Sequence, residues 1–299
     1  MRTRQLGPFT VSAIGLGGMP LSMNSSGLPP TDRAIATVHA ALDAGVTFID
    51  TADIYAPSWD AMGHNERLIA EALNAWSGDK STIVVATKGG ITRGEGETWG
   101  RDGTEAYLRA ALEKSLDALQ RDTIDLYQWH RPDRSLVYAQ VIETFAKFKA
   151  EGLISAIGIS NANVEEIAVA LDALGDGGLA SVQNRFSPQF RSSADELELC
   201  TQEGIAFLPW SPLGGIGNDA EKLNADYPGI AAVARAHAVS PQQVTLAWEL
   251  ALAPNVIPIP GASRPQSITD SVKAAELDLS DAEVQQISDS WGPQIPYAD

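Results

Sequence analysis

Cysteine is nearly absent from this 299-residue sequence, in which Cys200 is the single example. An internal disulfide is therefore impossible, and a small disulfide-stapled domain is excluded. A lone cysteine could still serve as a nucleophile, but Cys200 lies in the segment ADELELCTQEG, whose apolar residues recur at helical spacing. A packing role within a helix is the simpler interpretation.

Long hydrophobic runs are also missing, although hydrophobic residues make up 44% of the chain. No stretch reaches the roughly 18 consecutive apolar residues that a membrane-spanning helix needs. The N-terminal stretch MRTRQLGPFTVSAIGLGG has two arginines, but its apolar segment is too short for a secretory signal. We therefore expect a cytoplasmic protein with an ordinary globular composition.

Basic residues are scarce, because 21 Lys and Arg stand against 38 Asp and Glu, which gives a net charge of −17. Nucleic acids and anionic membranes repel so acidic a chain, and neither is expected as a partner. A phosphorylated ligand would need a local basic cluster or a row of backbone amides. The histidines, at positions 39, 64, 130 and 237, show no metal-ligand spacing, so no metal is expected.

What the chain does have is a regular alternation, and no linker rich in Pro, Gly or Ser interrupts it, so we expect one domain over residues 1–299. Short apolar, β-branched runs alternate with segments of helical period. The runs occupy residues 13–18, 47–52, 82–88, 124–130, 154–160, 181–187, 205–211 and 256–262.

Eight such repeats predict an α/β fold, a (β/α)₈ TIM barrel. A doubly wound sheet is the alternative, but its GxGxxG turn between strand and helix is missing. The leading segment TRQLGPFTVSA predicts a β-hairpin before the barrel, and LSDAEVQQISDSW predicts an extra C-terminal helix.

Polar residues stand where the predicted strands end, and in a barrel this rim carries the active site. The second strand ends at Asp50, with Tyr55 shortly after, the third ends at Lys88 and the fourth at His130. A lysine or histidine alone at such a place is often structural. Together the four groups have interlocking chemistry, because a carboxylate keeps a buried lysine charged, and that charge lowers the pKa of a phenol from about 10.

A tyrosine tuned in this way can donate a proton to a developing alkoxide, while a histidine orients the carbonyl group. The pattern therefore favours reduction of a C=O group by an external hydride donor. It suits acyl transfer poorly, since no Ser–His–Asp or Cys–His set is evident. Other polar residues at strand ends are Ser160, Asn161, Gln183, Asn184, Trp210 and Ser211.

At this point the sequence resembles the aldo-keto reductases over essentially its whole length. The motifs that carry the resemblance, in family order, are FIDTADIY, GHNERLIAEAL, VVATKGG, IDLYQWHRPD, AIGISN, VQNRFSP, PWSPLGG and IPGASRPQSITDS. The resemblance implies that Tyr55 is the general acid, that Lys88 and Asp50 tune it, and that His130 orients the carbonyl. It also implies a nicotinamide cofactor bound extended across the rim, with Ser160, Asn161 and Gln183 at the carboxamide and Trp210 stacked on the ring.

The segment SPLGGIG, which contains Ser211, Leu213 and Gly215, offers backbone amides with small side chains that could hold a pyrophosphate. A surface loop is the alternative interpretation. Ser263 and Arg264 precede a predicted helix start, where phosphate is favoured.

By resemblance, Ser263 and Arg264 clamp the 2′-phosphate of NADPH, which is preferred to NADH. Two positions depart from the family pattern. Ser267 stands where relatives often carry a basic residue, and Ser271 where they often have Asn at the adenine.

Substrate contacts are expected from Trp59, Trp129 and Arg131 in or beside the rim loops, with Trp99 nearby. Arg131 could instead pair with Asp133. The long Gly-containing loops 19–31, 92–103 and 213–227 are candidates for lids over substrate or cofactor.

The sequence thus predicts NADPH-dependent reduction of an aldehyde or ketone, a small-molecule carbonyl substrate. Sugar-derived aldehydes, pyridoxal, aromatic aldehydes and methylglyoxal-like compounds all fit this class. Two rivals are a Schiff-base aldolase that uses Lys88 as its nucleophile, and a non-catalytic, nucleotide-sensing subunit of the same fold. The aldolase leaves Asp50, Tyr55 and the Arg264 segment without a role.

Overall fold

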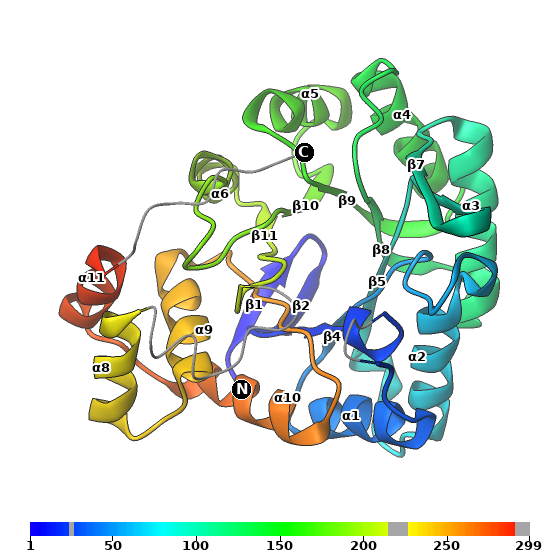
Figure 1. The fold of residues 1–299 in the computed structure, drawn as a ribbon. Helices are drawn as coiled ribbons and strands as arrows, with labels where there is room; N and C mark the ends of the chain where they lie inside the picture. Colours follow the sequence, from blue (N-terminus) through cyan, green and yellow to red (C-terminus); the bar gives the residue numbers. More distant parts are fainter. Residues whose placement is uncertain (24–26, 215–226, 291–299) are drawn as a thin grey trace.

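The computed structural model describes residues 1–23, 27–214 and 227–290, and at its centre lies a curved parallel sheet (Figure 1). Seven strands form it in the order β11-β10-β9-β8-β5-β4-β3. Every neighbouring pair is parallel. The strands are β3 (Leu16–Gly17), β4 (Phe48–Asp50), β5 (Val84–Gly89), β8 (Ile124–Trp129), β9 (Ile154–Ser160), β10 (Leu179–Gln183) and β11 (Ala206–Phe207).

The eighth predicted strand, 256–262, closes the barrel without forming a regular ladder. On one side, the Ile257 amide donates to the Phe207 carbonyl over 2.9 Å. On the other side, Gly15 and Gly17 donate to the carbonyls of Pro258 and Pro260 over 2.9 and 3.0 Å. The two prolines have no amide hydrogen to donate, which explains the missing ladder. The closed ring confirms the predicted (β/α)₈ barrel.

Helices surround the barrel, and most of them bury an apolar face against its strands (Figure 1). In chain order they are α1 (Thr31–Asp43), α2 (His64–Ala75), α3 (Glu105–Leu119), α4 (Tyr138–Ala150), α5 (Val164–Leu174), α6 (Ala194–Gln202), α8 (Pro228–His237), α9 (Pro241–Leu252) and α10 (Pro265–Val272). The predicted C-terminal helix is α11 (Asp281–Asp289), which starts at a capping box of Ser280 and Glu283. Helix α8 packs on α9 and α11. Within the described ranges, none of the helices is long and apolar enough to span a membrane.

The predicted N-terminal hairpin is β1 (Thr3–Leu6) and β2 (Phe9–Ser12), and it lies against the middle of the barrel (Figure 1). Leu6 and Val11 belong to the same buried cluster as Phe48, Val84 and Leu126 from the barrel strands. Gly7, between the two strands, has φ +52°, and a Cβ there would lie 2.6 Å from the Ala180 Cβ. This close approach requires glycine at position 7. Because Leu6 and Val11 pack against residues of the barrel strands, the hairpin closes one end of the barrel interior.

A second hairpin replaces the predicted loop 92–103. It consists of β6 (Ile91–Gly94) and β7 (Thr98–Arg101), which pair antiparallel. The turn between them contains Gly96 at φ 70°, a conformation that favours glycine. Of the other predicted lids, residues 24–26 and 215–226 lie outside the described ranges.

Candidate active site

The barrel interior holds a buried ion pair between Lys88 and Asp50. Side chains alternate between the two faces of a strand, so Lys88 on β5 points inward while Thr87 points toward the helices. The Lys88 ammonium donates to Asp50 Oδ2 over 2.6 Å, to the Thr51 carbonyl over 2.8 Å and to the Tyr55 hydroxyl over 3.3 Å. One cation therefore connects the carboxylate to the phenol.

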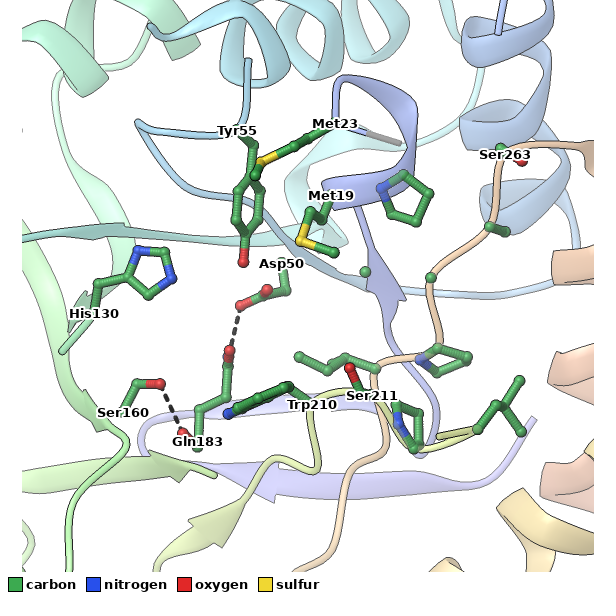
Figure 2. A pocket seen from close by; sticks show the side chains of 18 of the residues that line it. Met19, Met23, Asp50, Tyr55, His130, Ser160, Gln183, Trp210, Ser211 and Ser263 are labelled. Carbon is green, nitrogen blue, oxygen red and sulfur yellow. Dashed lines mark hydrogen bonds between the residues drawn. The ribbon is translucent and has the colours of Figure 1, made fainter. Parts of the chain in front are cut away.

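Two glutamines from other strands of the barrel hold the second oxygen of Asp50. Gln128 Nε2 on β8 donates to Oδ1 over 3.1 Å. Gln183 Nε2 on β10 donates to the same oxygen over 2.8 Å (Figure 2). The carboxylate thus has a charged partner on one oxygen and two amide donors on the other. Gln128 was not among the predicted site residues, although its inward position two residues before His130 could have indicated it.

Burial and charge act in opposite directions on Lys88 and Tyr55. Burial lowers the pKa of Lys88, but Asp50 and Tyr55 together raise it above its ordinary value. Burial raises the pKa of Tyr55, and the opposing effect of Lys88 does not cancel this. Lys88 lowers the pKa of Tyr55 as predicted, but the net pKa lies above its ordinary value, because the prediction left out the burial of the hydroxyl. Tyr55 is a protonated phenol at neutral pH.

His130 faces Tyr55 edge-on, with ring centroids 5.8 Å apart and planes at 83°. Burial lowers the pKa of His130 well below its ordinary value, and the charges of Lys88 and Arg131 lower it further. The imidazole is therefore neutral near pH 7, with one ring N–H able to donate a hydrogen bond. Its backbone carbonyl accepts from the Asn161 side chain over 2.9 Å, which fixes the strand end.

Tyr55 and His130 point into one cavity of about 730 Å³, with Trp210 on its opposite side (Figure 2). Next to Tyr55 the wall is apolar, with Met19 and Met23 from the segment after β3. These methionines were not among the predicted site residues. Only their position in the loop after the first barrel strand could have indicated them.

Among known proteins, a model of the aldo/keto reductase family matches residues 13–291 of the chain. The chain belongs to the aldo/keto reductase family. The resemblance seen in its motifs is thereby confirmed.

The relatives cover nearly the whole reductase chain. A 6-dehydroglucose reductase of Novosphingobium aromaticivorans is 35% identical, covering 92% of this chain and 90% of its own. A pyridoxine 4-dehydrogenase of Escherichia coli is 31% identical, covering 93% and 94%. Among solved structures, an aldo/keto reductase from Klebsiella pneumoniae in complex with NADP and acetate has a TM-score of 0.80 at 26% identity, covering 99% and 97%.

Most of the residues predicted for the reductase site do line its large cavity. Lys88 lies behind Asp50 and Tyr55 and is fully buried. Gly215 lies outside the described residues. Those brought together around the cavity are Asp50, Tyr55, His130, Arg131, Ser160, Asn161, Gln183, Trp210, Ser211, Leu213, Ser263 and Arg264.

Three predicted positions of the reductase lie elsewhere. Trp129 is 1% exposed and packs its ring 4.9 Å from that of Tyr138, because its position on β8 points toward the helices. Trp59 is 39% exposed at the start of a 3₁₀ turn (Trp59–Ala61) and does not line the cavity. The assignment of both to the pocket is corrected. Ser271 is buried on α10, outside the cavity lining.

Two of the residues predicted for the cofactor side have unusual backbone conformations. Asn161 has φ 58° and Ser211 φ 53°, both in the left-handed region that non-glycine residues rarely adopt. Arg264 precedes Pro265 at the start of α10, and its Nε donates to the Ser267 hydroxyl over 2.8 Å. Ser267 also lines the cavity. The guanidinium of Arg264 and the N-terminus of α10 thus lie together at one end of the cavity.

The β6–β7 hairpin is hydrogen-bonded to the loop that carries Tyr55. Arg93 is 8% exposed, and its Nη1 donates to the carbonyls of Ile54 and Ala56 over 3.2 and 2.8 Å. Its Nε donates to Glu97 over 2.6 Å, and Glu97 also accepts the Trp59 amide over 3.0 Å. The backbone on both sides of Tyr55 is therefore tied to the hairpin, a contact that the sequence alone does not indicate.

Proposed function

We propose that this aldo/keto reductase reduces an aldehyde or ketone to the alcohol with NADPH as hydride donor. One observation carries the proposal. The Tyr55 hydroxyl lies 3.3 Å from the Lys88 ammonium, which is itself paired with Asp50, at a cavity that His130 shares. The reductase and dehydrogenase activities of two relatives support the same reaction class.

Tyr55 has the properties of the general acid. Because burial raises its pKa, the phenol holds its proton near neutral pH and can pass it to a carbonyl oxygen as charge develops there. The Lys88 ammonium then stabilises the phenolate that remains. The neutral His130 can donate its ring N–H to the same carbonyl oxygen, which orients the substrate.

The residues around the cavity fit an extended dinucleotide. Trp210 offers a flat aromatic face, and Ser160 and Asn161 offer polar groups beside it. Arg264 and the N-terminus of α10 supply positive charge for a phosphate at the far end. When bound, the nicotinamide supplies the hydride. Aldo/keto reductases from Klebsiella pneumoniae in complex with NADP and with NADPH support the choice of NADPH.

The Schiff-base aldolase is disfavoured by the state of Lys88. A nucleophilic lysine must be neutral and reachable by the substrate carbonyl. Lys88 is fully buried, and Asp50 and Tyr55 raise its pKa. An ammonium group held by three hydrogen bonds is a poor nucleophile.

The decisive experiment measures carbonyl reduction by the wild type and by Tyr55→Phe, over a panel of aldehydes and ketones with NADPH and with NADH. We expect Tyr55→Phe to lose turnover by about 10²–10⁴-fold, the usual contribution of a general acid, with NADPH affinity unchanged. Turnover is followed by nicotinamide absorbance, and cofactor binding by fluorescence.

Tyr138→Phe is the matched control, because it removes a hydroxyl from a half-buried tyrosine that packs on Trp129 and does not line the cavity. Its activity should equal that of the wild type. Near-wild-type turnover of Tyr55→Phe would sink the assignment. Tight NADPH binding by the wild type without turnover on any carbonyl would support the nucleotide-sensing alternative.

A further inference from the structure

One polar residue, Asn65, connects two loops at the rim of the large cavity. It is the second residue of α2, and its side chain is fully buried. Its backbone amide is one of the N–H groups at a helix start that have no partner within the helix, and it donates to the Tyr55 carbonyl over 3.1 Å. The backbone of Asn65 thus holds the loop of the proposed general acid, which leaves the side chain for other contacts.

The side-chain amide of Asn65 holds the loop after β3. Its Nδ2 donates to the Gly18 carbonyl over 2.9 Å and to the Ser22 hydroxyl over 2.8 Å. Each of these two residues directly precedes a methionine of the apolar cavity wall, Met19 or Met23 (Figure 2). One amide group therefore fixes both ends of the segment that forms this wall.

The oxygen of the same side chain is bonded to the other loop. Asn65 Oδ1 accepts from the Thr51 hydroxyl over 2.6 Å, and Thr51 follows Asp50 in the chain. The orientation of the amide follows from its partners, because the Gly18 carbonyl can only accept a hydrogen bond. A Cβ at position 18 would lie 2.6 Å from Asn65 Oδ1 and 3.0 Å from the Asp50 carbonyl oxygen. The contacts of Asn65 thus need glycine at position 18 and set the spacing of the two loops.

The methionine wall, Met19 and Met23, packs on the loop of the proposed general acid. Both side chains lie against the buried cluster that includes Ile54, Tyr55 and Ile91. Methionine is flexible and apolar, so it adapts to a hydrocarbon group and offers only a weak acceptor to a hydroxyl group. The wall therefore favours an apolar neighbour next to the Tyr55 hydroxyl.

We propose that Asn65 is a positioning residue, which sets the place of the methionine wall relative to Tyr55 and thereby selects carbonyl substrates with an apolar chain. The proposal rests on the proposed reductase function. Asn65 is buried and does not line the cavity, so it acts through the loop after β3 and not by contact with the substrate. Loss of its side chain loosens the wall and leaves the backbone bond to Tyr55 in place.

The kinetic test compares Asn65→Ala with the wild type in reduction of propanal and hexanal by NADPH. We expect KM for hexanal to rise about 10-fold, the effect of losing roughly one methylene contact in an apolar pocket. Propanal makes fewer contacts with the wall, so its KM should change less. The kcat for both aldehydes and the KM for NADPH should stay close to the wild-type values, whereas a general loss of structure would lower kcat for both.

Hydrogen exchange measures the same loop without turnover. The amides of residues 21–23 donate to carbonyls of their own loop. We expect these amides to exchange about 10-fold faster in Asn65→Ala, because the loss of two side-chain hydrogen bonds makes local opening less costly. Exchange in residues 52–56 should not change, since the backbone bond between Asn65 and Tyr55 remains.

Asn255→Ala is the matched control. Asn255 also has two side-chain hydrogen bonds, donating to the Ile205 carbonyl and accepting from the Thr201 hydroxyl. It directly precedes the closing segment 256–262, at the end of the barrel away from the cavity, so KM for hexanal and exchange of residues 21–23 should match the wild type. If Asn65→Ala does not fold, Ser22→Ala removes one of the two bonds to the wall and should give smaller changes in the same direction.

Three results would overturn the proposal. They are unchanged exchange of residues 21–23 in Asn65→Ala, faster exchange with an unchanged KM for hexanal, and an equal loss of kcat for both aldehydes with no change in KM. Absence of carbonyl reduction by the wild type would contradict the proposed function itself. The exchange measurement would then still decide whether Asn65 holds the methionine wall.

Discussion

Asp50 ends an apolar strand, and its charge is stable there because three other strands supply partners for it. Lys88, Gln128 and Gln183 contact its two oxygens at distances of 2.6, 3.1 and 2.8 Å. None of these contacts is local in sequence. A residue that looks misplaced in its own segment is thus the centre of a network that the closed barrel assembles.

Replacing Asp50 by Asn tests this network. The change leaves Lys88 buried without its counter-charge, so we expect the free energy of unfolding to fall by about 3–5 kcal/mol, as for other broken buried pairs. The pKa of Lys88 should also fall, because Asp50 is the main group that raises it. Turnover should drop at least 10-fold, about 1.4 kcal/mol of barrier, with an altered pH profile of kcat.

Asp60→Asn is the control for Asp50→Asn, since Asp60 is an exposed acid in the same loop. It should leave stability and pH profile unchanged. A wild-type kcat with a wild-type pH profile in Asp50→Asn would show that the pair does not tune Tyr55.

At the scale of elements, the β6–β7 hairpin is the main addition to the predicted architecture. Its strands are four residues each, too short for their alternation to stand out from a loop. The hairpin matters because Arg93 hydrogen-bonds to the backbone on both sides of Tyr55. A segment taken for a lid is instead part of the support of the proposed general acid.

Arg93→Met should therefore lower kcat while leaving NADPH affinity close to that of the wild type. We expect a loss of about 10-fold, since a misplaced catalytic group is costly even when it is present. Arg93→Lys should recover part of the loss, because an ammonium can still donate to one of the two carbonyls. Steady-state kinetics and cofactor titration separate the two effects.

The control for Arg93 is Arg101→Met in the same hairpin, where the arginine donates to the Pro132 carbonyl and not to the Tyr55 loop. Equal losses in both variants would mean that the hairpin is merely destabilised. An unchanged kcat in Arg93→Met would remove Arg93 from the support of Tyr55.

At the scale of the whole molecule, a carboxylate on an outer helix is buried without a hydrogen-bond partner among the described residues. Glu249 on α9 is fully buried, and neither of its oxygens is hydrogen-bonded within the described ranges. Burial raises its pKa well above the ordinary value of 4.5. An acid with a raised pKa contributes stability that is fully present below its unfolded pKa and is lost as pH rises through the folded pKa.

Glu249→Gln cannot titrate, so it should gain stability relative to the wild type as pH rises from 4.5 toward 8. Urea denaturation at both pH values measures the difference, which should exceed about 1 kcal/mol at pH 8, the lower end for an uncompensated buried group. Glu113→Gln, which changes an exposed glutamate on α3, should give the same difference at both pH values. A pH-independent difference for Glu249→Gln would contradict the argument.

The sequence by itself determined the architecture and most of the cavity. Eight apolar runs in alternation with amphipathic segments predicted the barrel, because strand and helix periods are local properties of the chain. The same rule placed Asp50, Lys88 and His130 at strand ends, since catalytic groups on a barrel gather at one rim. The segment 256–262 was recognisable as the closing element from its apolar run, although its prolines prevent a regular ladder.

Only the tertiary structure decided which way each side chain faces and what surrounds it. Trp129 follows Gln128 by one residue, yet the first packs against α4 and the second contacts Asp50. The direction of the Tyr55 pKa also depended on the assembled barrel, because burial outweighs the charge of Lys88. The surroundings and the burial of a side chain depend on strands far apart in the chain. A local sequence pattern carries no information about how closely those strands pack.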